Sequence, residues 1–192
     1  MRGRWMLLGV GLLLLCLSGC SSAGPYGREL EETVLVRVLG VDRLERGVTL
    51  TAAGIDGEGE TVLVQVSGDK LEDAFAALPT AGEEYLSLTN VTQILLGDGV
   101  NWSTVLDYVV QDRSMSYTAT VWAVNGFAGP VIAQTQDGGV GRFDVLSQSG
   151  IEEITVKSAL ARLLTDKELA LPALSVQDGL LVPVGTLAIE VK

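Results

Sequence analysis

The chain has 192 residues, and its 13 basic and 24 acidic side chains give a formal net charge of −11 at pH 7. The basic residues are scattered singly, which excludes a nucleic-acid-binding protein, because such proteins need a clustered positive surface. Histidine is absent, and there are two cysteines, so catalytic triads with a histidine base and the usual zinc sites are excluded as well.

The first 19 residues have the three parts of a secretory signal. Arg2 and Arg4 form a short positive start, an apolar run covers 5–17, and small residues follow. As a helix, this run would reach about 20 Å, whereas the core of a bilayer measures about 30 Å. The pattern therefore predicts a signal peptide over 1–19 that is removed, rather than a permanent membrane span.

The letters LSGC at the end of this run resemble the bacterial lipobox. The resemblance implies cleavage between Gly19 and Cys20 and a diacylglycerol thioether on Cys20. Two acyl chains hold a protein stably at a membrane, whereas the acidic domain itself would be repelled by anionic headgroups. An ordinary signal peptide that contains a cysteine and an uncut anchor are the alternatives. The segment 20–27 is small, polar and turn-rich, which is typical of a flexible tether.

Three strands are predicted in the next part of the chain, over 33–42, 47–55 and 61–68. The last two flank the letters DGEGE, which are typical of a hairpin turn. A short helix is predicted next, with Asp69 as N-cap and Glu72 three residues later as its capping-box partner.

A buried strand is predicted over 85–97, bent near Asn90. The letters NWSTVLDYVVQD then indicate a helix with Asn101 as its cap and an apolar stripe that includes Trp102 and Leu106. A strand that alternates between two faces is expected over 117–126.

A long flexible connection is predicted over 134–149, because this segment is rich in glycine. A helix follows, with Ser149 and Glu152 as its capping box. The remaining chain reads as extended, with a turn at 178–179. Because strands and helices alternate irregularly and include at least one hairpin, the expected fold is α/β (α+β): one domain over 28–192, with a mixed β-sheet and flanking helices.

Catalytic chemistry is not expected from this sequence. The acidic residues fall mostly in turns and on polar helix faces, and the glycine-rich letters GIDGEGE and DGGVGRF match no phosphate-binding loop. The protein is therefore predicted to be no enzyme and to carry no metal or cofactor. A hydrolase with a carboxylate pair is the minority alternative.

Several segments, taken in order, resemble the Ger(x)C spore-germination lipoproteins. The opening letters GRELEETVLVRVLGVD are similar to the family's first strand, and the block from LSLTN to WAVNG is similar to its longest shared stretch. The positions that fall on the family pattern are Arg28, Glu29, Gly40, Asp42, Leu106, Asp107 and Asp112. The likeness covers the family's first domain, so the resemblance implies a divergent or shortened member.

Members of this family are the lipid-anchored C subunits of nutrient germinant receptors. The resemblance therefore implies a lipoprotein on the extracytoplasmic face of the cell or spore inner membrane that docks on membrane-embedded receptor subunits. The 134–149 segment is a candidate for that contact, since long loops between firm elements often carry binding residues. The alternative is an extracytoplasmic lipoprotein that binds a small ligand or serves envelope assembly.

Overall fold

The computed structural model describes residues 32–112, 114–143, 146, 151–166 and 168–190. The signal peptide, the tether and the predicted lipid attachment at Cys20 lie outside the described residues. So do Arg28 and Glu29 of the family pattern.

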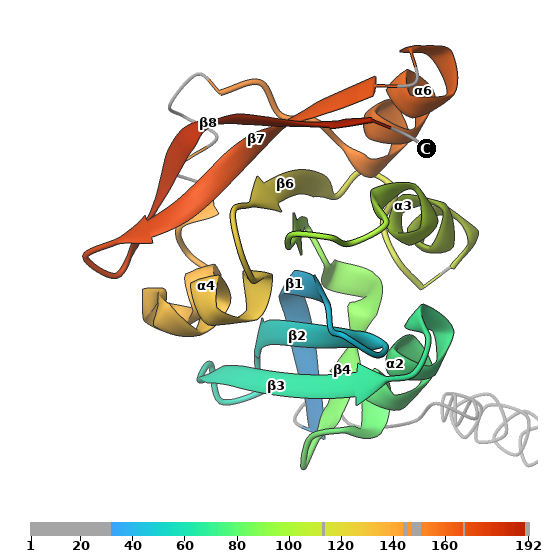
Figure 1. The fold of residues 1–192 in the computed structure, drawn as a ribbon. Coiled ribbons are helices and arrows are strands. Elements are labelled where there is room, and N and C mark those ends of the chain that lie inside the picture. The colour runs from blue at the N-terminus through green and yellow to red at the C-terminus, as the bar shows by residue number, and fades with distance from the viewer. Residues whose placement is uncertain (1–31, 113, 144–145, 147–150, 167, 191–192) are drawn as a thin grey trace, which may run out of the picture.

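Strands and helices alternate along the described chain (Figure 1). The strands are β1 Thr33–Arg43, β2 Val48–Ile55, β3 Thr61–Gly68, β4 Tyr85–Ser87, β5 Gln93–Leu96, β6 Thr120–Val124, β7 Glu168–Gln177 and β8 Leu180–Glu190. The α-helices are α2 Leu71–Ala77, α3 Trp102–Gln111, α4 Ala128–Gln134 and α6 Val156–Asp166, and the short 3-10 helices are η2 Leu78–Thr80, η3 Leu88–Asn90 and η4 Gln136–Gly139.

All of these strands join one mixed, eight-stranded sheet. Its order is β3-β2-β1-β5-β6-β7-β8, and β4 pairs with β1 beside that path. The neighbours β1, β5, β6 and β7 run parallel, while β2 and β3 on one side and β8 on the other are antiparallel to their neighbours. This arrangement confirms the predicted fold class, a mixed sheet with flanking helices.

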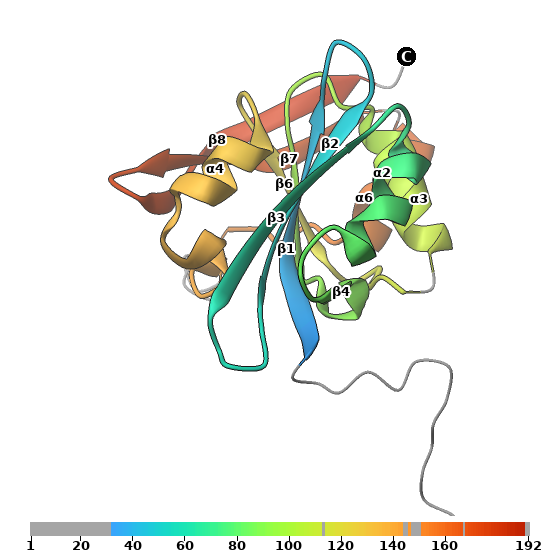
Figure 2. The ribbon, with the colours of Figure 1, turned by 90° about the horizontal axis from the view of Figure 1, so that it is seen from below.

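Helices cover both faces of the sheet, but unequally. Figure 2 shows α2, α3 and α6 on one side and α4 on the other. The three-helix face encloses the larger buried cluster, which includes Leu39, Ile94 and Leu106. The α4 face encloses a smaller one, which includes Trp122 and Ile132. Both faces of the central strands are therefore buried, which explains the continuous apolar runs in their sequences.

Both predicted turns are present, and both connect the two strands of a hairpin. In the first, between β2 and β3, the Asp56 Oδ1 atom accepts hydrogen bonds from the backbone N–H groups of Glu58 (3.0 Å) and Glu60 (2.8 Å). In the second, between β7 and β8, Asp178 and Gly179 have φ values of 51° and 74°. Positive φ at both central residues matches the twist of a two-residue hairpin, which explains the Asp-Gly pair.

The helix starts were predicted with mixed success. Asn101 caps α3 as expected, because its side chain accepts a hydrogen bond from the Thr104 N–H at 3.2 Å. Asp69 does not cap α2: the N-cap is Lys70, and its side chain makes no capping hydrogen bond. The predicted capping box at Asp69 and Glu72 was therefore wrong: β3 ends at Gly68 as predicted, but the helix begins one residue later than expected, at Leu71.

The start of α6 was also predicted wrongly. The helix begins at Val156, and the Thr155 hydroxyl accepts from the N–H of Ser158 at 3.3 Å, so Thr155 takes the capping role given to Ser149. The residues before the helix are extended instead, since the Ile154 carbonyl accepts from the Val121 N–H at 2.8 Å. These hydrogen bonds with β6 satisfy backbone N–H and C=O groups before the helix, so these groups need no bonds within a longer helix.

Two further segments depart from the sequence-based expectation. The strand predicted over 85–97 is divided into β4, η3 and β5, so the bend near Asn90 is a helical turn. The connection predicted to be flexible over 134–149 begins with η4 and then buries Phe143 and Leu146 against the sheet. Within its described residues, this connection is therefore part of the smaller core.

Candidate functional site

The family-pattern residue Asp42 holds α4 on the sheet. Asp42 is at the end of β1 and is 3% exposed. Its carboxylate accepts hydrogen bonds from the N–H groups of Ala128 (2.6 Å) and Gly129 (2.8 Å), the first two residues of α4. The first N–H groups of a helix have no partner within the helix, and the helix dipole favours negative charge there. Asp42 therefore satisfies this helix start from a distant part of the chain.

Gly40 completes this junction by allowing a close approach. A Cβ atom at Gly40 would lie 2.7 Å from Ile132 Cδ1 and 3.2 Å from Ala128 Cβ. Any side chain there would push α4 away from the sheet and out of reach of the Asp42 carboxylate. The glycine-hydrophobic-aspartate pattern is thus a docking point for a helix.

Burial raises the pKa of the Asp42 carboxyl above its usual value. The two backbone hydrogen bonds from Gly129 and Ala128 act in the opposite direction and offset part of this effect. The carboxylate is therefore positioned by good hydrogen bonds, but its charge is costly to bury.

The other described pattern residues also have framework roles. Leu106 is fully buried in the larger core. Asp107 is exposed and accepts from Gln111 Nε2 at 2.7 Å on the same helix. Asp112 ends α3, where its carboxylate accepts from the Ser114 N–H at 2.8 Å. None of these residues lines the cavity described next, so the structure separates the family pattern from the candidate site.

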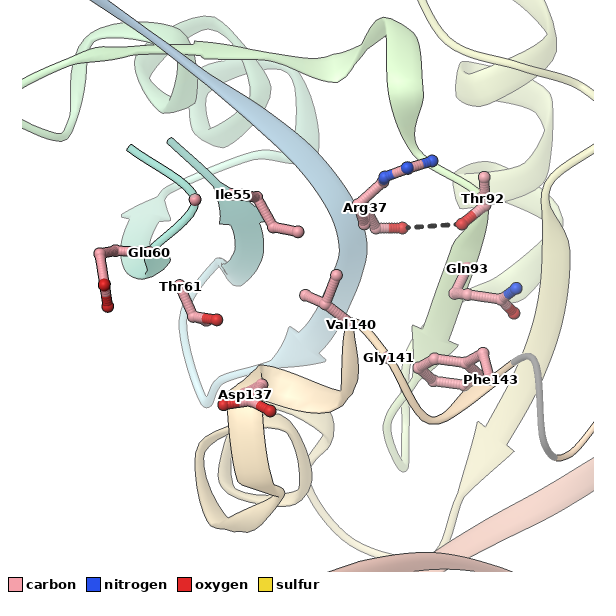
Figure 3. Close-up of a pocket in the computed structure, with 11 residues that line it drawn as sticks. Arg37, Ile55, Glu60, Thr61, Thr92, Gln93, Asp137, Val140, Gly141 and Phe143 are labelled. Carbon is pink, nitrogen blue, oxygen red and sulfur yellow. Dashed lines mark hydrogen bonds between the residues drawn. The ribbon is translucent and has the colours of Figure 1, made fainter. Parts of the chain in front are cut away.

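The candidate site is a cavity of about 560 Å³ on the α4 side of the sheet (Figure 3). Its lining comes from β1, β2, β3, β5 and the segment that follows α4. The lining residues are Arg37, Ile55, Gly59, Glu60, Thr61, Thr92, Gln93, Asp137, Val140, Gly141 and Phe143. Four of them belong to the 134–149 segment predicted as a contact, which the structure thus brings to the cavity wall.

Arg37 is the basic residue of this cavity, and a β-bulge determines its position. The register between β1 and β2 shifts between Val36 and Val38, so Arg37 has no partner on β2. The Arg37 carbonyl instead accepts from the Thr92 N–H at 3.0 Å. Bulges re-aim side chains and are frequent beside binding sites. Here the bulge brings a charged residue into the cavity from the middle of an apolar strand.

A buried tryptophan, Trp122, packs behind the part of the cavity wall that contains Gln93 and Phe143. The Trp122 indole N–H donates to Gln93 Oε1 at 2.7 Å, and the Trp122 ring lies 6.0 Å from the Phe143 ring. Because the indole can only donate, the bond fixes which end of the Gln93 amide faces it. The cavity wall is therefore rigid on this side.

A second hollow, of about 180 Å³, adjoins Arg37 on the side of the η3 and β6 loops. Its lining is dominated by hydroxyl and amide side chains: Thr89, Asn90, Thr92, Ser116 and Thr118. The two hollows share Arg37 and Thr92. Arg37 thus borders both the larger cavity and a smaller, hydroxyl-rich hollow.

The polar side chains of the site can form hydrogen bonds with a ligand. Hydroxyl, amide and guanidinium groups recognise ligands by hydrogen bonds, and Glu60 and Asp137 lie at the opposite rim from Arg37 (Figure 3). In the part of the chain that the structure describes, no three Asp, Glu, Cys or His side chains are arranged to hold a metal ion. No helix among the same residues has the length and apolar character needed to span a membrane.

The sequence-based reasoning missed Arg37. A signal was present, because the letters TVLVRV place one charge inside a strand that is otherwise apolar. A charge on the second face of a central strand needs either a partner or access to water. The bulge that provides this access is decided by pairing with β2 and β5, which the letters of β1 alone do not show.

Comparison with known proteins gives one similarity. No family model matches the chain, and no curated protein does. Among solved structures, the fold is similar to that of the GerBC protein, with a TM-score of 0.40 and 16% identity over 79% of this chain.

The match covers 48% of GerBC, so the chain spans about half of that protein's length.

Proposed function

We propose that this protein is a lipid-anchored, non-enzymatic component of a nutrient germinant receptor, similar to its C subunit. Cys20 would carry the lipid, and the domain would lie on the extracytoplasmic face of the cell or spore inner membrane. It would act in spore germination by docking on membrane-embedded partner subunits. The lipid confines the domain to two dimensions, which raises its effective concentration near such partners.

The observation that supports this proposal most directly is the use of Gly40 and Asp42. These two residues of the family pattern form the joint between the sheet and α4. In this chain, the residues at these family positions have a structural role. The family's role is for this reason the function that we infer.

The contact with a partner is best sought at the rim formed by the segment after α4. Deleting 134–149 is a poor test, because Phe143 and Leu146 belong to the smaller core. Gly141 is a better target, since a Cβ atom placed on it would meet no atom within 4 Å. Gly141→Arg therefore adds a large charged side chain to the rim without changing the packing.

The test is affinity capture of the tagged protein from sporulating cells, followed by mass spectrometry of the captured proteins and of the Cys20 peptide. Expected results are an acyl modification at Cys20, capture of multi-span membrane proteins, and loss of both in Cys20→Ala. Gly141→Arg should lower the capture severalfold. Leu164→Arg is the matched control, because Leu164 is 80% exposed on α6, on the opposite face of the sheet.

The proposal is overturned if Cys20 carries no acyl group, or if spores that lack the protein germinate normally with every nutrient tried. Capture of a transporter permease with its ATPase would instead favour the alternative, a lipoprotein that binds a small ligand for uptake.

A further inference from the structure

Among the described residues, the Arg37 guanidinium has no ion-pair or hydrogen-bond partner, although the chain has more acidic than basic side chains. Acidic side chains outnumber basic ones by 24 to 13 in the sequence. Nevertheless, no described carboxylate lies within ion-pair distance of the Arg37 guanidinium, and no hydrogen bond from that group is found within the described chain. Arg37 also lies on β1, which has neighbours on both sides in the sheet. A base at such a position is available to a ligand.

The groups around Arg37 complete a set that is suited to an oxyanion. Figure 3 shows its side chain extended toward Thr92 and away from Glu60 and Asp137. Beyond Thr92, the Ser116 and Thr118 hydroxyls lie 2.7 Å apart in the second hollow. An oxyanion only accepts hydrogen bonds, and the mutual bond uses one of the two O–H donors, so one O–H group of this pair remains to donate to a ligand.

From this geometry, we propose that Arg37 anchors a binding site for the oxyanion group of a ligand, a carboxylate or a phosphate. The planar guanidinium forms two parallel hydrogen bonds to such a group, and the remaining O–H group of the Ser116–Thr118 pair donates a further one. Glu60 and Asp137 at the far rim repel polyanions, so the site selects a ligand that has one anionic group. This inference goes beyond the docking proposal and rests on the described residues alone.

Two sources could supply the oxyanion. One is a small dissolved molecule that enters the 560 Å³ cavity. The other is a lipid headgroup: Arg37 is four residues after the first residue of β1, about 13 Å along the strand. The chain that leads to Cys20 enters β1 at that same end. The two sources share the chemistry of the site and are separated by the arms of the experiment.

The experiment uses the full-length protein in micelles of a neutral detergent and measures its thermal midpoint. Sodium phosphate or sodium acetate is added in one arm, with sodium chloride at equal ionic strength as reference. In the other arm, phosphatidylglycerol is added to the micelles, with phosphatidylcholine as reference. A ligand that binds the folded state raises the midpoint in a saturable manner.

Two variants test the site. Arg37→Gln removes the charge, and Arg37→Lys keeps the charge but cannot form two parallel hydrogen bonds to an oxyanion. Arg46→Gln is the matched control, because Arg46 is an exposed arginine in the turn between β1 and β2. We expect the apparent affinity to fall at least tenfold in Arg37→Gln, to fall less in Arg37→Lys, and to stay unchanged in Arg46→Gln.

A saturable response to phosphate or acetate supports the site with a dissolved ligand, and a response to phosphatidylglycerol alone supports it with a lipid headgroup. The proposal is overturned if neither arm gives a saturable response, or if Arg46→Gln weakens the response as much as Arg37→Gln does. The second outcome would mean that general charge, rather than the Arg37 site, attracts the anion. Neither outcome bears on Cys20 or on partner capture, so the docking proposal is tested separately.

Discussion

The two faces of the sheet are built differently, and this difference separates stability from recognition. On one face, α2, α3 and α6 cover a large cluster of aliphatic side chains. On the other, a seven-residue helix, a 3-10 turn and a glycine-rich segment cover a smaller cluster. The 560 Å³ cavity is on this second face.

The thinner layer allows polar groups to reach the middle of the sheet. On the three-helix face, a charged residue of β1 would be buried without water, which costs several kcal/mol unless it is paired. On the α4 face, the bulge at Arg37 and the cavity beside it keep the guanidinium accessible. We therefore expect substitutions on the first face to affect stability, and surface substitutions around the cavity to affect binding.

The largest effect is expected from the core of the three-helix face. Leu106→Ala should lower the free energy of unfolding by about 4 kcal/mol, and Ile132→Ala on the α4 face by about 2 kcal/mol, because a thinner layer relaxes more readily around a lost side chain. Urea unfolding measures both. Val110→Ala, an exposed position of α3, is the control and should change little. Equal losses at Leu106 and Ile132 would contradict the inferred difference between the faces.

The next effect concerns the joint that holds α4. Asp42→Ala should lower the free energy of unfolding by about 3 kcal/mol, since it leaves two N–H groups of the helix start without acceptors. Asp42→Asn should cost less, because its amide oxygen still accepts one of these bonds. Asp107→Ala, which changes an exposed carboxylate of the same family pattern, should have little effect. If Asp42→Ala proves no worse than Asp107→Ala, the proposed joint is not what stabilises α4.

A smaller effect is expected at the wall of the cavity. Gln93→Leu should lower the free energy of unfolding by about 1–2 kcal/mol, because the buried Trp122 indole loses its acceptor. The proton signal of the Trp122 indole should shift in the NMR spectrum. Gln111→Leu removes an exposed side-chain hydrogen bond on α3 and serves as the control. An unchanged indole signal would show that the Gln93 bond is not formed in solution.

A fourth prediction compares the cap of α3 that the structure shows with the cap of α2 that the sequence predicted. Asn101→Ala should lower the free energy of unfolding by about 1 kcal/mol, since Asn101 caps α3. Asp69→Ala should have almost no effect, because Asp69 does not cap α2. Chemical unfolding of the two variants in parallel measures the difference. The reverse order would restore the capping box that the sequence predicted.

The smallest effect is the pH dependence that Asp42 contributes. Burial raises the pKa of its carboxyl in the folded state, so the folded protein holds this proton more tightly than the unfolded chain. The contribution of Asp42 to stability is then fully present below the unfolded-state pKa and is lost as the pH rises through the folded-state pKa. The measurement is the free energy of unfolding of the wild type and of Asp42→Asn across the acidic range. The wild type should lose stability relative to Asp42→Asn as the pH rises. A difference that grows in favour of the wild type with rising pH would contradict it.

Local chemistry made several features predictable. The DGEGE and Asp178-Gly179 turns were identified correctly, because their backbone conformations and hydrogen bonds involve residues that are neighbours in the chain. Asn101 was predicted as a cap for the same reason. The helix starts at Asp69 and at Ser149 were predicted by equally good local patterns and were wrong. Before α6, backbone pairing with β6 took precedence over the local pattern.

By itself, the sequence determined the fold class, the β2–β3 hairpin, the turn at 178–179 and the α3 helix. These follow from apolar periodicity, turn chemistry and composition, which act over a few residues. Only the tertiary structure decided the strand order, the Asp42 joint to Ala128 and the bulge that presents Arg37. The physical reason is distance along the chain: the Asp42 bond spans 86 residues, and no local preference of either segment specifies the partner that satisfies it.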